Sequence, residues 1–359
     1  MTNYILRRVL SSIPVLIGIL FVTFALARLL PGDPCRAVLG ERATDAICNA
    51  FIHRHGLDKP IPVQFVVYVN EILHGDFGVS FRFSETVGQL LIERLPTTIE
   101  LSFSALILSI ILGIPLGIIS AVRHNTWVDV LTMTWANIGV SMPVFWLGLM
   151  LAFVFSLLLK GTPFALPPSG RLNAGVLAPT FAQVWGLKVP NQGFVALLVE
   201  FISRLNILNA LLTANWSLLL DAIKHLILPS MALATIPMAL IARMARSSML
   251  DVLGQDYIRT ARAKGLSMNK VILKHAFRNA LLPLATVIGL ELGGLLGGAV
   301  LTETVFNLSG MGRTLYDAIT ARDYGIVQAF TVVIAVFFVV LNLIVDLSYA
   351  YLDPRIQLK

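Results

Sequence analysis

Long apolar runs separated by shorter polar connections dominate the hydrophobic pattern of this chain. A bilayer core of about 30 Å requires roughly 20 helical residues, and in lipid a helix satisfies its backbone groups within one segment. Six runs are long enough, and we predict that each forms a membrane-spanning helix. They are Val9–Ala27, Leu101–Val122, Val130–Leu159, Leu226–Ala242, Ala280–Leu301 and Gly325–Leu347.

The composition supports this prediction and argues against a soluble domain. Of the 359 residues 57% are hydrophobic and only 13% are charged, a balance typical of an integral membrane protein. The first run follows only two arginines and ends without a small-residue cleavage pattern. A retained helix is therefore favoured over a removed signal peptide, and the expected fold class is an all-α integral membrane protein.

Basic residues mark alternate connections between the predicted spans. The four groups are Arg7 with Arg8, Arg123 with His124, the eight Lys and Arg residues between Arg243 and Arg278, and Arg355 with Lys359. Since Lys and Arg are enriched in cytoplasmic loops, six spans place all four groups and both termini in the cytoplasm. The net charge of +7 then suits loops beside anionic lipid and does not indicate nucleic-acid binding.

The segment Gly193–Leu212 is nearly long enough to be a seventh span. Glu200 and Arg204 would then lie near its centre, each at a cost of about 2.5–3.5 kcal/mol, and the main basic cluster would move outside. We therefore expect an outer-surface helix, within a long outer segment, Lys160–Lys224.

The other long outer segment, Leu30–Pro96, contains both cysteines of the chain, Cys35 and Cys48. In an oxidising compartment a disulfide between them would stabilise the segment by about 3 kcal/mol. Two unpaired thiols are the alternative, and spacing alone leaves both open.

Motifs for enzymatic chemistry are absent from the sequence. There is no phosphate-binding loop of the form G-x-x-x-x-G-K-[ST], no H-E-x-x-H, no C-x-x-C and no G-x-S-x-G. The chain is therefore expected neither to hydrolyse ATP nor to bind a metal or cofactor, and transport is the better use of six spans.

The main basic connection has the pattern of a helical hairpin. Asp256–Lys264 is predicted to form a short helix with Asp256 as its N-terminal cap. Gly265 suits the left-handed turn that ends a helix, and Ser267 can cap a second helix running to Leu282.

Three cations of the second helix, Lys270, Lys274 and Arg278, share one face at four-residue spacing. An interfacial helix beside anionic headgroups would explain that stripe. It explains the helix–glycine–helix pattern less well, which favours a surface for a partner protein.

The hairpin resembles the EAA loop of permease subunits in binding-protein-dependent ABC importers. Arg259, Thr260 and Ala261 take the leading positions of EAA-x-x-x-G, and Gly265 takes the glycine; the later proline comes at Pro283, as in the dipeptide, oligopeptide and nickel branch. Further matching motifs are ILRRVL, LPGDP, GLDKP, HGDFGVS, SMPVFWLG, RMARSSMLDVLGQDYIRTARAKGL, LTETVFNLSGMGR, ARDY and NLIVDLSYAYLDPRI.

The resemblance implies a type I importer permease in a bacterial inner membrane. It implies a second homologous permease, two ATPase subunits that bind ATP and Mg, and a periplasmic binding protein as partners. The hairpin would dock on one ATPase. The implied coupling residues are Asp251, Gln255, Asp256, Tyr257, Arg259, Thr260, Ala261, Arg262, Lys264 and Gly265.

Spans and resemblance together give the expected domain organisation. The divisions are residues 1–29 with the first span, an outer region 30–96, a core permease domain 97–350 with an outer insertion 160–224 and a coupling loop 248–280, and a cytoplasmic tail 351–359.

The fifth predicted span carries candidate pathway residues. Glycines at four-residue spacing from Gly289 to Gly297 favour close helix packing. Glu291 shares a face with a second small pair, Gly294 and Gly298. Since an ionisable residue at membrane depth is a candidate functional group, Glu291 could attract a peptide's amino group. A carboxylate buried against the partner permease, or protonated and packed, is the alternative.

Two further features concern the pathway and its surroundings. Pro143, close to Ser141, should kink the third span, for a moving pathway or only for packing. Asp346 could pair with Arg243 or Arg246 at the inner ends of their spans, in a structural role.

The outer connection Leu301–Tyr324 is, by resemblance, the loop that approaches the binding protein; a plain surface loop is the alternative. Its candidate contact residues are Thr302, Glu303, Asn307, Gly310, Gly312 and Arg313.

The sequence therefore predicts the permease subunit of an ATP-driven importer for dipeptides or short peptides. Nickel complexes, glutathione and oligopeptides are alternative cargoes. A stand-alone ion-coupled transporter is the alternative from another class, and a membrane-embedded enzyme lacks convergent catalytic groups.

Overall fold

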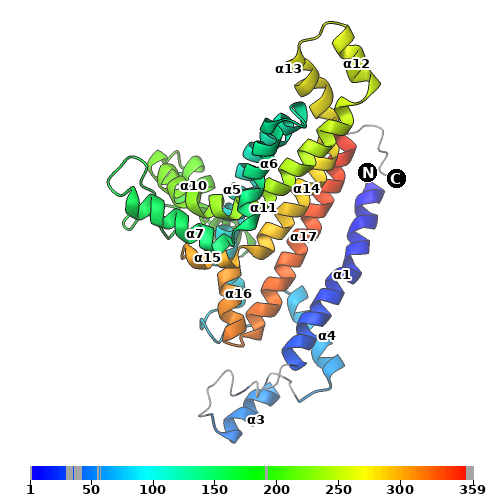
Figure 1. Ribbon diagram of the computed structural model, residues 1–359. Helices are drawn as coiled ribbons and strands as arrows, with labels where there is room; N and C mark the ends of the chain where they lie inside the picture. The colour runs from blue at the N-terminus through cyan, green and yellow to red at the C-terminus, as the bar shows by residue number, and fades with distance from the viewer. Residues whose placement is uncertain are drawn as a thin grey trace.

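The computed structural model describes residues 2–29, 35, 43–54, 56, 58–190 and 193–352, and across these ranges the chain is helical with connecting turns (Figure 1). Within them, β-type pairing is limited to an isolated bridge between Val79 and Thr86. The predicted turn Leu30–Pro34 and the basic residues Arg355 and Lys359 lie outside the described residues.

Five long helices are apolar enough to cross a membrane. They are α1 (Thr2–Leu29), α5 (Val87–Val122), α11 (Trp216–Leu253), α14 (Phe277–Gly298, preceded by a short helical lead-in) and α17 (Tyr324–Leu352). Two sharply bent helix pairs raise the possible number of spans to seven. The all-helical membrane fold is confirmed, whereas the count of six and the inside position of the termini stay predictions.

The arrangement of the helix ends agrees with the predicted topology. The start of α1, the end of α17 and the hairpin that contains α12 (Asp256–Ala263) lie at one end of the molecule, and α3 (Asp45–Arg54) lies at the other (Figure 1). An odd number of crossings from the start of α1 to the hairpin, α1 included, would place these two ends on opposite sides.

The centre of the bundle is the contact between α5 and α11, which depends on glycines. A Cβ atom on Gly117 would lie 2.5 Å from the carbonyl oxygen of Ala242, and one on Gly113 would lie 2.8 Å from that of Met238. Small residues let the two backbones approach closely, and Ser109 Oγ donates across the contact to the Ala234 carbonyl at 2.9 Å.

The third apolar run does not form the single kinked span that the sequence predicts. It divides into α6 (Trp127–Ser141), α7 (Val144–Ala152) and a π-helical turn, Phe153–Leu158, and α6 and the segment after it are bent by 98°. Pro143 precedes α7, and Met142 before it is extended, with φ −103° and ψ 136°. Because a proline lacks an N–H and disfavours a helical residue before it, the helix breaks instead of kinking.

The outer insertion contains α8 (Phe181–Val184), α9 (Phe194–Ser203) and α10 (Asn206–Leu212). The axes of α9 and α10 are bent by 97°, so residues 193–212 do not form one straight helix. Arg204 Nη2 lies 3.0 Å from Glu93 of α5 and 2.9 Å from Glu200. These pairs satisfy the two charges that argued against a membrane span.

The first helix packs against α17 and against α4 (Ile61–Leu73), where Phe24 stacks on Tyr68 with ring centroids 5.7 Å apart. In the same outer region Cys35 and Cys48 are joined by a disulfide, with Cα atoms 5.3 Å apart.

Most of the predicted domain boundaries fall inside helices. The boundary at residues 96 and 97 lies within α5, the end of the insertion at residue 224 and the start of the coupling loop at residue 248 lie within α11, and the boundary at residues 350 and 351 lies within α17. The end of the coupling loop at residue 280 lies within α14. The helices α5 and α11 start at Val87 and Trp216, whereas their apolar runs start at Leu101 and Leu226, because the first turns of both helices are partly polar.

Candidate functional site: coupling hairpin and groove

The basic hairpin is continuous with two long helices. The turn Gly254–Gln255 connects α11 to α12, and α12 is followed by α13 (Met268–Lys270), a π-helical turn (Val271–Ala276) and α14. Figure 1 shows α12 and α13 projecting beyond the ends of the neighbouring helices. Gly265, between the two arms, has φ +75°, the left-handed conformation that the sequence predicts.

One side of the hairpin packs inward as a small apolar cluster. Ile258 and Ala261 of α12 are 1% and 7% exposed and lie against Met249 and Val271, which are fully buried. Ala261 is therefore part of the base of the hairpin and is not available to a partner. The other predicted coupling residues are exposed; they are Asp251, Gln255, Asp256, Tyr257, Arg259, Thr260, Arg262, Lys264 and Gly265.

Two predicted helix caps differ from the structure. Gln255 occupies the N-cap position of α12 and Asp256 is its first helical residue, where its charge still suits the helix dipole. Ser267 is the N-cap residue of α13 but its side chain makes no capping hydrogen bond.

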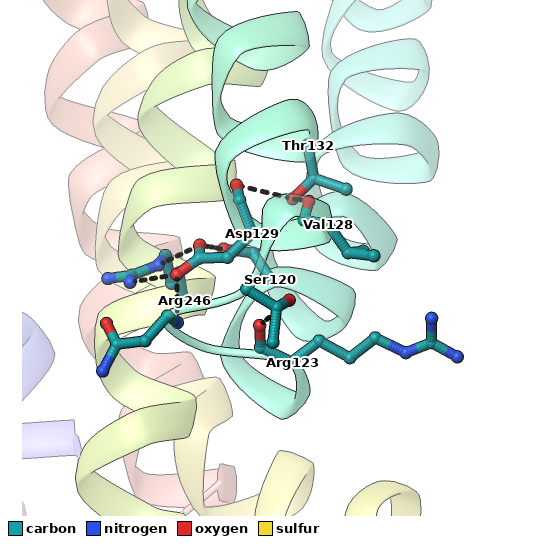
Figure 2. Close-up of polar contacts among 8 residues, drawn as sticks. Ser120, Arg123, Val128, Asp129, Thr132 and Arg246 are labelled. Atoms are coloured by element: carbon teal, nitrogen blue, oxygen red, sulfur yellow. Dashed lines mark hydrogen bonds and ion pairs between the residues drawn. The ribbon is translucent and has the colours of Figure 1, made fainter.

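Near the hairpin, an ion pair ties three helices together (Figure 2). Asp129, in the first turn of α6, accepts from Arg246 of α11 through both oxygens, with Nε–Oδ1 2.8 Å and Nη2–Oδ2 2.7 Å. Ser120 Oγ of α5 donates to Oδ1, and the Asn125 N–H donates to Oδ2 at 3.0 Å. Asp129 is 6% exposed. A buried carboxylate requires hydrogen-bond partners, and these four donors compensate its charge.

The predicted pairing of Asp346 with Arg243 or Arg246 is wrong. Asp346 instead pairs with Arg8 of the first helix, at 2.7 Å, because α17 packs against α1. Arg246 pairs with Asp129 instead. Asp129 lies in the first turn of an apolar run, and that position alone did not predict a pairing with Arg246.

A groove runs along one face of α6 beside this ion pair. It consists of two adjoining hollows of about 490 and 480 Å³ that share Val130, Met133 and Asn137. Thr134, Asn137 and Ser141 recur at helical spacing. Ser141 lines one hollow, and Arg243 lines the other, together with Asp129 and Arg246.

Pro143 does not line these hollows. It lies beyond the end of α6, directly before α7. From the sequence, Arg243 was considered only as a partner for Asp346 and as part of the basic cluster, whereas Thr134 and Asn137 were missed. The signal that could have found them is the polar spacing of three, four and seven residues in an otherwise apolar helix.

The two glycine faces of α14 have different environments. A Cβ on Gly289 would lie 2.0 Å from Val345 Cγ2, and one on Gly293 would lie 2.5 Å from the Phe338 ring, so this face packs closely on α17. Gly294 has no such neighbour within 4 Å.

Glu291, on the open face of α14, is partly buried. Among the described residues it has no hydrogen bond or ion pair. Gly298 ends the same helix. The open face is therefore available to a partner chain or to cargo.

The predicted outer loop after α14 is instead a folded unit of two helices, α15 (Val300–Val305) and α16 (Met311–Thr320). Glu303, 0% exposed, accepts from Thr98 Oγ1 at 2.7 Å and from the Arg313 N–H at 2.8 Å. It thus caps α16, and a Cβ on Gly310 would lie 2.2 Å from its Oε1. Burial raises the pKa of Glu303 to about 7.

This burial corrects the list of residues expected to face a binding protein. Thr302, Glu303, Gly310 and Gly312 are buried, because they form the contact between α15 and α16. Asn307 is exposed and bonds Arg313, so these two keep the predicted role as an expectation.

No group of three or more His, Cys, Asp or Glu residues is placed to hold a metal ion in the part of the chain that the structure describes. The helical bundle, its projecting hairpin and its polar groove define a multi-pass transport component. Comparison with known families agrees. Residues 113–358 match the binding-protein-dependent transport system inner membrane component, and residues 1–102 match the N-terminal unit of such membrane components.

The chain belongs to this family of inner-membrane permeases. The dipeptide transport system permease protein DppB of Alkalihalophilus pseudofirmus is 43% identical over 357 residues, covering 99% of this chain and 100% of that protein. The di/tripeptide transport system permease protein DppB of Pseudomonas aeruginosa is 42% identical, covering 99% of both chains. The oligopeptide transport system permease protein AppB of Bacillus subtilis is 39% identical, with 99% and 100% covered.

Proposed function

We propose that this permease imports dipeptides or other short peptides as one half of an ATP-driven transporter. A second homologous permease would complete the pathway, two ATPases with ATP and Mg would bind the cytoplasmic side, and a periplasmic protein would deliver cargo. Full-length similarity to permeases named for dipeptides and di/tripeptides supports this cargo class.

The observation that carries the mechanism is the continuity of the hairpin with α11 and α14. A partner that moves α12 moves the end of α11, because only the turn Gly254–Gln255 separates them and the apolar cluster around Ile258 packs α12 onto α11. The same α11 carries Arg246, which is bonded to α6 and its groove. ATP-dependent closure of the ATPases would thereby shift the equilibrium between two conformations of the groove.

Reconstituted complexes test this coupling. Arg259→Gln with Arg262→Gln should weaken ATPase binding and abolish ATP-driven uptake, while Arg123→Gln removes a cation outside the hairpin as the matched control. Unchanged assembly and uptake in the double variant would refute the coupling role. Uptake by the permease alone under an ion gradient, without ATPases, would support the ion-coupled alternative instead.

Cargo class is tested with wild-type complexes. Labelled dipeptides, tripeptides, pentapeptides, glutathione and nickel complexes are offered with the matching binding protein, and uptake per ATP hydrolysed is compared. We expect dipeptides and tripeptides to be favoured. Preference for nickel complexes, glutathione or pentapeptides would overturn the assignment to short peptides.

A further inference from the structure

One hollow of the groove along α6 is lined by a cation without a carboxylate partner. Arg243 Nη1 donates to Asn137 Oδ1 at 2.9 Å, and no carboxylate among the described residues pairs with it. Its neighbour Arg246 is neutralised by Asp129 at 2.7–2.8 Å. Of the two cations that line this hollow among the described residues, Arg243 therefore has the uncompensated charge.

Asn137 fixes the direction of that charge. Its Nδ2 donates to the Met133 carbonyl at 2.7 Å, which leaves Oδ1 for the guanidinium. A guanidinium has five N–H donors in a planar fork, and Asn137 accepts from only one nitrogen. The remaining donors are free for an anion in the hollow of about 480 Å³ that Arg243 lines.

Charged residues on membrane-spanning helices commonly face a polar pathway or a partner. Arg243 lies within the helix α11, directly after the apolar run Leu226–Ala242, and its side chain is exposed. Thr134 and Ser141 continue the polar face of α6 away from it. The arrangement suits a polar ligand that passes along the groove.

We propose that Arg243, oriented by Asn137, binds the C-terminal carboxylate of a peptide as it passes along this groove. The proposal rests on the proposed function, since it requires a short peptide as cargo. A guanidinium matches a carboxylate with two parallel hydrogen bonds, and every unmodified linear peptide has one such group at its C-terminus. The site would hold the carboxylate transiently on the cytoplasmic side of Ser141.

Substitution of Asn137 separates this role from a structural one. Asn137→Asp keeps the side-chain size and strengthens the tie to Arg243, so a merely structural contact would be preserved. It also neutralises the free charge, so carboxylate binding should be lost. We expect Asn137→Asp and Arg243→Gln each to lower peptide uptake about tenfold, whereas Arg243→Lys retains part of it and Arg123→Gln is unaffected.

The chemistry of the cargo gives the second readout. Binding protein saturated with a peptide acid, or with the same peptide as its C-terminal amide, is presented to reconstituted complexes, and uptake per ATP hydrolysed is compared. Wild-type complexes should favour the acid about tenfold, and Arg243→Gln should remove the preference. A preference that persists in Arg243→Gln would overturn the proposal, and so would wild-type uptake by Asn137→Asp.

Failure of the proposal is distinguishable from failure of the proposed function. If wild-type complexes take up no short peptide with ATP, the function itself is wrong. If they do and Arg243→Gln slows the acid and the amide equally, Arg243 instead contacts the partner permease or a lipid phosphate. That result would overturn the carboxylate site and leave peptide import standing.

Discussion

Asp129 and Arg246 form a two-point ion pair that joins α6 to α11 at the end of the bundle nearest the coupling hairpin. The pair lies where α11 approaches the hairpin and where the groove of α6 begins. The pair therefore connects the coupling hairpin, which we propose binds an ATPase, to the groove of α6, which we propose binds cargo.

Asp129→Ala should destabilise the permease by about 2 kcal/mol, because it leaves a half-buried cation and two further donors without an acceptor. Thermal unfolding in detergent measures this. Exchange of the two residues, Asp129→Arg with Arg246→Asp, should restore part of the stability. If the single variant unfolds like the wild type, the pair contributes nothing measurable.

Gly289→Ala should separate α14 from α17, because its Cβ would lie 2.0 Å from Val345 Cγ2. Overpacking of this kind costs about 1–3 kcal/mol. Gly294→Ala is the matched control, with no neighbouring atom within 4 Å. Adding Val345→Ala to Gly289→Ala should recover stability; a failure to do so would place the strain elsewhere.

Glu303 should make stability depend on pH. Its folded pKa of about 7 exceeds the ordinary value of 4.5, so the folded state binds more protons between these values. The stabilising contribution is complete below about pH 4.5 and is lost as the pH rises to about 7, by about 3 kcal/mol.

Glu303→Gln should remove this dependence, since its side chain stays neutral. Melting temperatures at pH 5 and pH 8 compare the two proteins, with the exposed Glu71→Gln as control. A wild-type melting temperature that does not fall between pH 5 and pH 8 would contradict a neutral, buried Glu303.

Gly265→Val should impair coupling without a steric clash. No atom lies within 4 Å of the added Cβ, but φ is +75°, where a β-branched residue costs about 1–2 kcal/mol. Gly254→Ala, at φ −78°, is the control. ATP-driven uptake and ATPase retention on affinity resin measure the effect; equal values for both variants would show that the turn does not require glycine.

The disulfide between Cys35 and Cys48 should be present in protein purified from an oxidising compartment. Mass spectrometry after alkylation, with and without reductant, checks it. Modification of both thiols without reductant would exclude the bond.

The sequence predicted the helical membrane fold because long apolar runs have few alternatives in lipid. It also predicted a helical hairpin in the basic connection and the left-handed conformation of Gly265, since both depend on local chemistry. The break at Pro143 was predicted only as a kink, because the apolar composition of both halves does not report a change of direction between them.

Tertiary pairs could not be predicted in the same way. Asp129, Arg246, Arg8 and Asp346 are all near helix ends, and charge alone permits several combinations. The packing of α1 on α17 and of α6 on α11 decides between them. The burial of Glu303 was hidden for the same reason, because the segment LTETVFNLSGMGR, with its polar residues and two glycines, has the composition of an exposed loop.

The ion pair between Arg8 and Asp346 joins the first helix to the last. During synthesis, Arg8 therefore enters the bilayer region long before Asp346 has been translated. Until α17 is made, α1 lacks this helix as a packing partner, and the face that packs on it contacts lipid or the insertion machinery. Truncated chains that end before α17 should therefore be degraded faster by membrane quality-control proteases than full-length chains.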